Sequence, residues 1–449
     1  MKPKFLSFRQ SSSGKSVSTV VTACLFTAMA HAATVTWDGA PDGGGSSADA
    51  NWSTGNNWVG DVPPNPTGDS LVFDGTTNLA AHNDSLVTEL GSTSITFAAG
   101  AGSFLLSSDV QIKVGVAGND NFVTKTSAND QEISAPIKLA GGGRDRTILM
   151  AGGGTLTLSG NLDFSNDWLF PTTSAGTIVL SGNNNGDGKG AVLNAGTNTM
   201  RAMMRNNVAN TQLLIGSDTA LGNSGFGTIA GGDANYRGVV ANQPLFVGTS
   251  GGSHSISGSS FIINTSWIDF NGADDLSIGS LINQGGNRDF KVTSTGSLTA
   301  QGGIALSHDQ TSRQFYLNMT GSGEMTVNGP LSNTFHSGGI VTQGVNDKYG
   351  VPANSLFRKA GAGTLRLNGD STSTFNGEFR IENGTVVLGD PGALGPATYT
   401  AGLTIVQDAD VIIDDPTVFV VDATGIVVGM NVSGQGIPAN TTVTEVDGT

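Results

Sequence analysis

The chain has 449 residues, of which 66 are glycine and 14 are proline; 13% are charged, and the formal net charge is −15. Glycine is about twice as frequent as usual but is not every third residue, which excludes a collagen-like chain. The low charge excludes a coiled coil and a charge-driven disordered chain, and the single cysteine excludes a disulfide scaffold. The acidic balance argues against nucleic acid as a partner, because neutralisation of phosphates drives that binding.

Residues 1–32 have the pattern of a secretory signal peptide. A basic stretch precedes the mostly apolar residues 17–29, and Ala30 and Ala32 frame a small-x-small site, with the cut expected after Ala32. Cys24 lies in a segment that loosely fits the bacterial lipoprotein pattern, so a lipid-modified Cys24 is the alternative. No run of 18 apolar residues follows, so we expect no transmembrane helix in the mature chain.

Residues 33–75 differ from the rest because they hold Trp37, Trp52 and Trp58, three of the five tryptophans, together with several prolines. The end of a repetitive β-fold exposes unpaired backbone and needs an atypical covering segment. We therefore predict an N-terminal cap over residues 33–75. The alternative is that the three tryptophans are glycan contacts on an aromatic platform.

Residues 76–400 carry a recurring unit of the form Gly-small-Leu-x-Leu-x-Gly. Its copies are GTLTLSG at 154–160, GTIVLSG at 176–182, GTLRLNG at 363–369, GTVVLGD at 384–390 and, more loosely, GSLTAQG at 296–302 and GEMTVNG at 323–329. Two pairs of copies are spaced by 21 or 22 positions. Apolar and polar residues alternate within each copy, which predicts a short strand, and the flanking glycines permit tight turns.

A single short strand cannot bury its apolar face, whereas stacked coils line a continuous core. The spacing therefore predicts an all-β protein, a right-handed parallel β-helix of roughly 15 coils with about 22 residues each. Tandem β-sandwich domains are the alternative, because they share this composition. They would not explain why the unit recurs at 21 or 22 positions.

The clearest copy covers residues 359–395, KAGAGTLRLNGDSTSTFNGEFRIENGTVVLGDPGALG. It resembles the autotransporter-associated β-strand repeat proteins, and departs from their pattern at Glu378-Phe379-Arg380. The matching residues are Gly361, Gly363, Thr364, Leu365, Leu367, Gly369, Gly384, Thr385, Leu388, Gly389, Ala393, Leu394 and Gly395. The resemblance implies a β-helical passenger of a diderm bacterium, exported with outer-membrane machinery and displayed at or released from the cell surface. It also implies that the repeat aids secretion and is not an active site.

Residues 401–449 predict a further β unit, with strands near 402–406, 411–413, 417–421 and 426–428. The sequence ends on a turn signal, without the alternating strands and terminal aromatic residue of a translocating barrel. We therefore expect that the C-terminal unit is truncated.

Metal and cofactor sites are not predicted. The histidines of the mature chain, His82, His254, His308 and His336, are too far apart for metal-ligand spacing. Residues 183–188, Asn-Asn-Asn-Gly-Asp-Gly, resemble a calcium loop but offer too few carboxylates, so we interpret them as a turn.

Charged pairs give no catalytic signature either. Adjacent acids, Asp274-Asp275 and Asp414-Asp415, point to opposite faces of a strand and do not form a glycosidase pair. The basic groups Arg144-Asp145-Arg146 and Arg358-Lys359 are interpreted as surface charge.

The sequence thus predicts a non-catalytic, exported surface or adhesin-like β-helical protein. Its expected partners are extracellular glycans or the surfaces of host or neighbouring cells. One alternative is a polysaccharide-degrading β-helix enzyme, a lyase or a glycosidase. The other is a carbohydrate-binding protein that uses Trp37, Trp52 and Trp58.

Overall fold

The computed structural model describes most of the chain between residues 33 and 395 and short pieces beyond. The described residues are 33–41, 49–65, 67–84, 89–115, 120–165, 167–173, 176–185, 189–194, 198–222, 236–284, 286–307, 313–333, 335–336, 339–340, 355–395, 409–411, 418–420, 426, 430–432, 441–443 and 446. The predicted signal peptide with Ala30 and Ala32, and Cys24, lie outside them. So do His308 and Asp414-Asp415.

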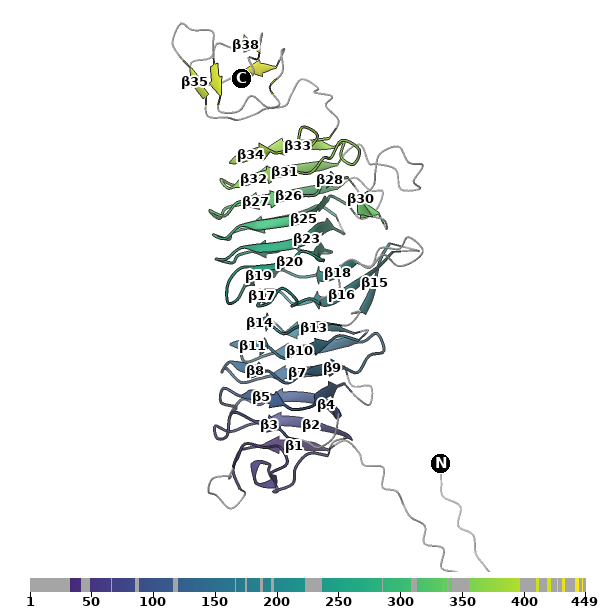
Figure 1. The fold of residues 1–449 in the computed structure, drawn as a ribbon, viewed down its shortest axis with the longest axis vertical. Helices are drawn as coiled ribbons and strands as arrows, with labels where there is room; N and C mark the ends of the chain where they lie inside the picture. Colours follow the sequence, from purple (N-terminus) through teal and green to yellow (C-terminus); the bar gives the residue numbers. More distant parts are fainter. Residues whose placement is uncertain are drawn as a thin grey trace, which may run out of the picture. The chain divides into compact units, whose positions relative to one another are not determined.

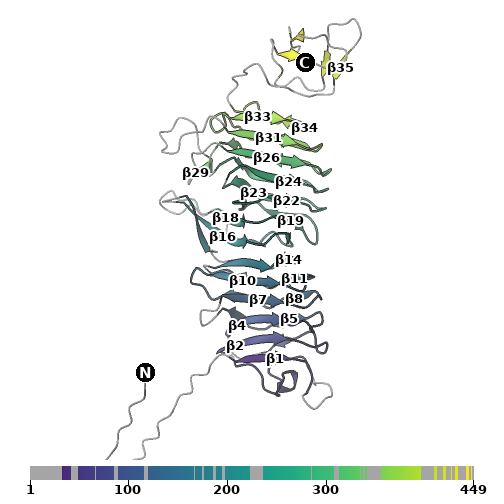
Figure 2. The ribbon, with the colours of Figure 1, turned by 180° about the vertical axis from the view of Figure 1, so that it is seen from behind.

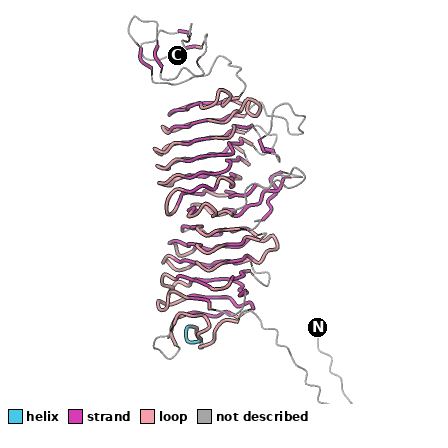
Figure 3. Tube along the Cα trace, in the orientation of Figure 1, coloured by secondary structure: helices cyan, strands magenta, loops and turns pink. Residues whose placement is uncertain are grey.

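Short parallel strands wind into stacked coils (Figures 1 and 3). The strands of the coils lie on three faces. The first face is a 12-stranded sheet. Its strands, in the order in which they pair, are β3 (His82–Asn83), β5 (Leu105–Ser108), β8 (Gln131–Ile133), β11 (Thr155–Leu158), β14 (Thr177–Leu180), β17 (Thr211–Ile215), β19 (Leu245–Thr249), β22 (Ile268–Phe270), β24 (Arg288–Val292), β26 (Gln314–Met319), β31 (Leu356–Ala360) and β33 (Glu378–Ile381).

The second and third faces belong to one 20-stranded sheet. Its strands are β1 (Thr34–Trp37), β2 (Thr67–Phe73), β4 (Glu89–Phe97), β6 (Gln111–Val114), β7 (Asn121–Lys125), β9 (Ile137–Leu139), β10 (Asp145–Met150), β12 (Leu162–Asp163), β13 (Trp168–Thr173), β15 (Lys189–Asn194), β16 (Asn198–Asn206), β18 (Tyr236–Ala241), β20 (His254–Ile256), β21 (Ser259–Ile263), β23 (Leu276–Asn283), β25 (Leu298–Ala305), β27 (Met325–Val327), β28 (Leu331–Ser332), β32 (Thr364–Leu367) and β34 (Thr385–Leu388). The two faces join because long strands run through both: β4 pairs with β6 on the second face and with β7 on the third.

The remaining elements are small. They are the 3-10 helix η1 (Gly55–Asn57) and the antiparallel pairs β29 (Phe335–His336) with β30 (Gly339–Ile340), β35 (Ala409–Val411) with β36 (Val418–Val420), and β37 (Asn431–Val432) with β38 (Thr441–Thr442). The part of the chain that the structure describes contains no helix with the length and apolar character needed to cross a bilayer.

Strand pairing is parallel throughout the 12-stranded sheet. In the larger sheet only the pair of β15 and β16 is antiparallel among the described strands. Seen from either side, the strands lie one above another (Figures 1 and 2). The predicted parallel β-helix is confirmed. The tandem β-sandwich alternative is wrong, because sandwich sheets are built from antiparallel strands.

The recurring unit does form strands that stack in register. Leu156 of β11 lies beside Ile178 of β14, and Leu365 of β32 lies beside Val386 of β34. The copies at 154–160 and 176–182 lie on the first face, whereas the other four lie on the second. The unit therefore specifies a strand between two corners, not a particular face.

Coil length varies more than the sequence suggested. Phe357 and its neighbour Phe379 are 22 positions apart, but Phe315 and Phe357 are 42 apart. The first face has 12 strands where uniform coils predicted roughly 15, because insertions such as the β15–β16 hairpin lengthen some coils. The residues that depart from the repeat pattern, 378–380, still form a strand, β33.

The core lies inside the coils, and strand alternation builds it. In β10 every second residue is buried, and β11 follows the same pattern. Inward-facing phenylalanines of the first face also stack: successive ring centroids from Phe290 through Phe315 and Phe357 to Phe379 are 4.7, 5.2 and 4.9 Å apart. Complete burial of such a ring, as at Phe290, Phe315 and Phe357, contributes about 1.5–3 kcal/mol, so the stack adds to backbone pairing between coils.

Candidate functional site

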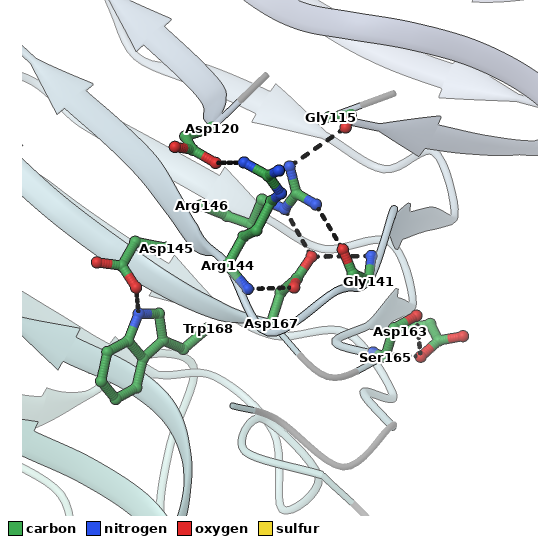
Figure 4. A network of polar contacts seen from close by, with 10 residues as sticks. All are labelled: Gly115, Asp120, Gly141, Arg144, Asp145, Arg146, Asp163, Ser165, Asp167 and Trp168. Atoms are coloured by element: carbon green, nitrogen blue, oxygen red, sulfur yellow. Dashed lines mark hydrogen bonds and ion pairs between the residues drawn. The ribbon is translucent and has the colours of Figure 1, made fainter. Parts of the chain in front are cut away.

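A cluster of charged side chains lies at the corner between the second and third faces (Figure 4). Arg146 Nε and Asp167 Oδ2 are 2.6 Å apart, and the two side chains are 1% and 0% exposed. The Arg146 guanidinium also donates to the carbonyls of Gly115 (3.3 Å) and Gly141 (3.1 Å). Asp167 in turn accepts from the backbone N–H groups of Gly141 (2.9 Å) and Arg144 (2.8 Å).

Strand geometry brings this pair together. Arg146 is the second residue of β10, where every second side chain points inward. Asp167 directly precedes β13, which pairs with β10 as the next coil. The interpretation of residues 144–146 as surface charge is therefore wrong for Arg146. It is right for Arg144, which forms an exposed ion pair with Asp120 at 2.9 Å.

The cluster joins coils and does not present reactive groups. Gly115 follows β6, Gly141 follows β9, and Asp167 precedes β13, so three successive coils meet at one guanidinium. A lyase or glycosidase centre needs carboxylates and a base within reach of the polymer. The buried pair of Arg146 and Asp167 does not meet that requirement, and its chemistry is that of an inter-coil contact.

A second polar contact lies beside the cluster. Trp168 Nε1 donates to Asp145 Oδ1 at 2.7 Å, and the Arg205 guanidinium lies 5.2 Å from the centre of the Trp168 ring. Trp168 is only 4% exposed, so this ring is covered and is not a platform for a sugar.

The three N-terminal tryptophans are core residues. Trp37, Trp52 and Trp58 are 0%, 2% and 0% exposed. Trp58 makes edge contacts with Trp37 (5.2 Å) and Trp52 (6.0 Å), and Phe73 lies within 6.2 Å of all three rings. A sugar stacks only on an exposed ring face, so burial favours the packing interpretation over the glycan-contact interpretation.

The same segment gives strand β1 backbone partners beyond β2. Trp58 forms an antiparallel bridge with Trp37, and the Val59 N–H donates to the Thr36 carbonyl at 2.8 Å. These contacts fit the predicted cap over residues 33–75, whose boundaries stay a prediction.

Two histidines, His82 and His254, contact acids of neighbouring coils. His82 Nε2 lies 3.2 Å from Asp109 Oδ2, and His254 Nδ1 lies 3.2 Å from Asp218 Oδ1. The hydrogen bond from the Ser255 N–H to the Asp218 carboxylate holds the pKa of Asp218 below its ordinary value, and His254 makes a smaller contribution in the same direction. Within the described ranges, no group of three or more His, Cys, Asp or Glu side chains is arranged to hold a metal ion.

The remaining candidates also bridge coils. Asp274 Oδ2 lies 3.5 Å from Thr249 Oγ1 of the preceding coil, whereas Asp275 Oδ1 accepts from the Ser297 N–H of the following coil at 2.8 Å. Asn184, from the calcium-like segment, is fully buried and donates to the Ala220 carbonyl at 2.7 Å. Each side chain is occupied by a structural hydrogen bond.

Two buried lysines were not expected. Lys125 and Lys359 are both 0% exposed, so the interpretation of Arg358-Lys359 as surface charge is wrong for Lys359. Burial lowers the pKa of Lys359 to about 8 and also lowers that of Lys125. The Lys-x-Gly-x-Gly sequence at 359–363 was a usable signal that Lys359 has a special position. Lys125 is followed by Thr-Ser-Ala, so the sequence carries no such signal for it.

The repeat residues occupy strand and corner positions. Leu365 and Leu367 point into the core, whereas Leu388 is half-buried because the described stack of coils ends with β33 and β34. The corner and strand-end positions are held by Gly361, Gly363, Gly369, Gly384 and Gly389, and the first residues of β32 and β34 are Thr364 and Thr385.

Comparison with known proteins identifies the repeat. Residues 150–168 and 357–388 match the model of the passenger-associated transport repeat. No curated protein and no solved structure matches the chain. The first matched segment runs from the end of β10 to the start of β13, and the second runs from β31 to β34, so both are integral parts of the stacked coils.

Proposed function

We propose that this protein is an exported, passenger-like scaffold whose repeat coils promote its own secretion and display. A β-solenoid chain with two passenger-associated transport repeats fits the autotransporter-associated β-strand repeat proteins. The observation that supports this is the position of the repeats. Both matched segments form coils of the solenoid itself. A transport function of these segments is therefore tied to the folding of the coils that they form.

We place the mature chain outside the cell, secreted or at the surface of a diderm bacterium. The repeat is associated with passengers, and the leader pattern ending at Ala32 supports export. Contact, not catalysis, is the proposed activity, with extracellular glycans or the surfaces of neighbouring cells as partners. Among the described residues, the charged clusters at Arg146 and Asp275 are engaged in contacts between coils, which supports this choice.

A pair of coil deletions tests the secretion function. Deleting residues 357–378 removes one coil that carries the repeat, and register is kept because Phe357 and Phe379 pair. Deleting residues 268–289 removes a coil of the same length outside the matched segments, between the paired Ile268 and Phe290. Expressed in a diderm bacterium with its own leader, the chain without 357–378 should reach the surface or medium in clearly smaller amounts than the control deletion. Equal export of the two would contradict the proposal.

The non-catalytic part is tested separately with the mature chain. Incubation with plant and algal glycans should release neither reducing ends nor unsaturated products, while binding to intact cells or to a glycan array should be measurable. Product formation would favour the polysaccharide-degrading alternative.

A further inference from the structure

The ammonium group of Lys359 lies in a cradle of backbone carbonyls. Its Nζ donates to Gly361 O (2.6 Å) and Gly363 O (2.5 Å), both in the turn between β31 and β32. The third acceptor is Asn383 O at 2.8 Å, in the turn between β33 and β34 of the next coil. An ammonium has three N–H donors, so these three acceptors satisfy it completely without any carboxylate.

Lys125 makes the equivalent contact at a different corner. Its Nζ donates to Ser127 O (2.8 Å) in its own turn and to Gly153 O in the turn between β10 and β11 of the next coil. Lys359 is the second-to-last residue of β31 on the first face, whereas Lys125 is the last residue of β7 on the third face. The same contact therefore forms at two corners of the solenoid, and in each case the side chain reaches forward to the following coil.

In both cases the receiving carbonyl precedes a left-handed glycine. Gly384 follows Asn383 with φ +82°, and Gly154 follows Gly153 with φ +66°. A β-carbon at Gly384 would overlap Lys359 Nζ and the carbonyl oxygens of Gly361 and Gly363. One at Gly154 would lie 2.7 Å from Ala128 O and 3.1 Å from Lys125 Nζ. The lysine and the backbone carbonyls around it thus leave room only for glycine at the facing turn of the next coil.

We propose that Lys125 and Lys359 each form a lysine bridge, a buried ammonium contact that fastens one coil to the next and accepts only a coil that presents glycine at the facing turn. The lysine bridge is defined by the pairs Lys125 with Gly153-Gly154 and Lys359 with Asn383-Gly384. It makes closure of a coil depend on two sequence positions that lie more than 20 residues apart. This inference rests on geometry and is independent of the proposed export function.

The matched repeat segments coincide with this device. Residues 357–388 contain Lys359 and its receiving turn at 383–384, and residues 150–168 contain the receiving turn of Lys125 at 153–154. The glycines that bracket the repeated strands therefore have a second function beside forming turns. Carbonyls in these turns accept hydrogen bonds from the ammonium of the preceding coil, and the absence of a β-carbon leaves space for it.

Hydrogen–deuterium exchange on the full mature chain tests the proposal. Lys359→Met should make exchange about 10-fold or more faster in the next coil, where Glu382 N–H donates to Lys359 O (2.8 Å) and Gly389 N–H donates to Leu367 O (2.7 Å). Lys125→Met should accelerate exchange instead at residues 151–159, where the Ala151 N–H donates to Lys125 O (2.9 Å). Each variant is the control for the other, and Lys138→Met, on the outer side of β9, should leave both regions unchanged.

Glycine substitutions test the receiving side. Gly384→Ala and Gly251→Ala impose the same positive-φ strain, at φ +82° and +81°, but nothing lies within 4 Å of a β-carbon at Gly251. Gly384→Ala should therefore accelerate exchange in residues 378–389 well beyond the local effect of Gly251→Ala. Equal effects would show that only backbone strain is at work and would overturn the glycine requirement.

If Lys359→Met leaves the coil too unstable to read, Lys359→Ala with added propylammonium replaces it. Propylammonium restores the atoms that the substitution removes, so it should return protection to residues 378–389, whereas tetramethylammonium, which has no N–H donor, should not. The lysine bridge is refuted if Lys359→Met changes exchange in residues 378–389 by less than twofold, if the lysine variants accelerate exchange uniformly along the chain, or if both ions restore protection alike.

Discussion

Lys359 combines three hydrogen bonds with complete burial, and burial lowers its pKa from 10.5 to about 8. Between pH 8 and 10.5 the unfolded chain keeps this proton while the folded chain loses it. The unfolded state then binds more protons, so the free energy of unfolding rises with pH across this window. At neutral pH Lys359 is charged in the folded chain, so the cost of desolvating the ammonium offsets part of the stabilisation that its three hydrogen bonds contribute.

This sign gives a pH prediction. The free energy of unfolding of the mature chain, measured by urea denaturation from pH 7 to 10, should contain a rising contribution of the order of 1–3 kcal/mol that Lys359→Met lacks. Lys125, whose pKa is also lowered by burial, contributes in the same direction and remains in both proteins. Parallel pH curves for the two proteins would show that Lys359 does not titrate in this range.

The buried pair of Arg146 and Asp167 should respond asymmetrically to substitution. Arg146→Met leaves Asp167 charged and buried, and we expect a loss of about 3–5 kcal/mol in the free energy of unfolding. Adding Asp167→Asn removes the stranded charge and should recover part of that loss, because an amide oxygen still accepts from the Gly141 or Arg144 N–H. Arg144→Met should cost less than about 1 kcal/mol, since its pair with Asp120 is solvent-exposed. Thermal or urea unfolding of the four proteins provides the comparison.

The phenylalanine stack of the first face connects neighbouring strands. Phe357 is fully buried between Phe315 and Phe379, whereas Phe379, on the last described strand of this sheet, is only partly buried. Phe357→Ala should therefore cost about 3–5 kcal/mol, and Phe379→Ala clearly less. Local exchange rates in β31 and β33 would report the difference, and equal losses would mean that the aromatic stack does not transmit stability between coils.

Strands β11 and β32 show what could be predicted from the sequence. Alternation within GTLTLSG and GTLRLNG identified β11 and β32, because a strand with one buried face needs this pattern. The partners of Arg146 and Lys125 lay beyond prediction, since they depend on which residues meet across a coil. That offset varies from 22 positions at Phe357 to 42 at Phe315, through insertions that leave no periodic signal.

The burial of Trp37, Trp52 and Trp58 was also beyond prediction from the sequence. Their clustering in residues 33–75 marked a special segment, and composition alone could not decide between a ring that packs and a ring that binds. In the structure all three rings contact Phe73 of β2, so they face the core and are packing residues. Burial of this kind is a property of the assembled coils.

In the stacked coils as a whole, each coil pairs with its immediate neighbours, so stability should add coil by coil. A coil removed in register ought then to leave the rest able to close. Deleting residues 268–289 brings Phe290 into the position of Ile268, and Leu298 into that of Leu276, because these residues already pair. The deletion does remove polar contacts of the lost coil, such as the hydrogen bond from Thr293 to Asp269.

We therefore expect the chain without residues 268–289 to keep its β-sheet circular dichroism and to unfold at a moderately lower temperature. Deleting only residues 268–278 is the matched test, because half a coil shifts every later strand to a different face and places inward residues outside. That protein should lose cooperative unfolding altogether. If both deletions fold equally well, the coils are not held by register, and the nearest-neighbour description fails; if neither folds, the solenoid is a single cooperative unit that does not tolerate the loss of any coil.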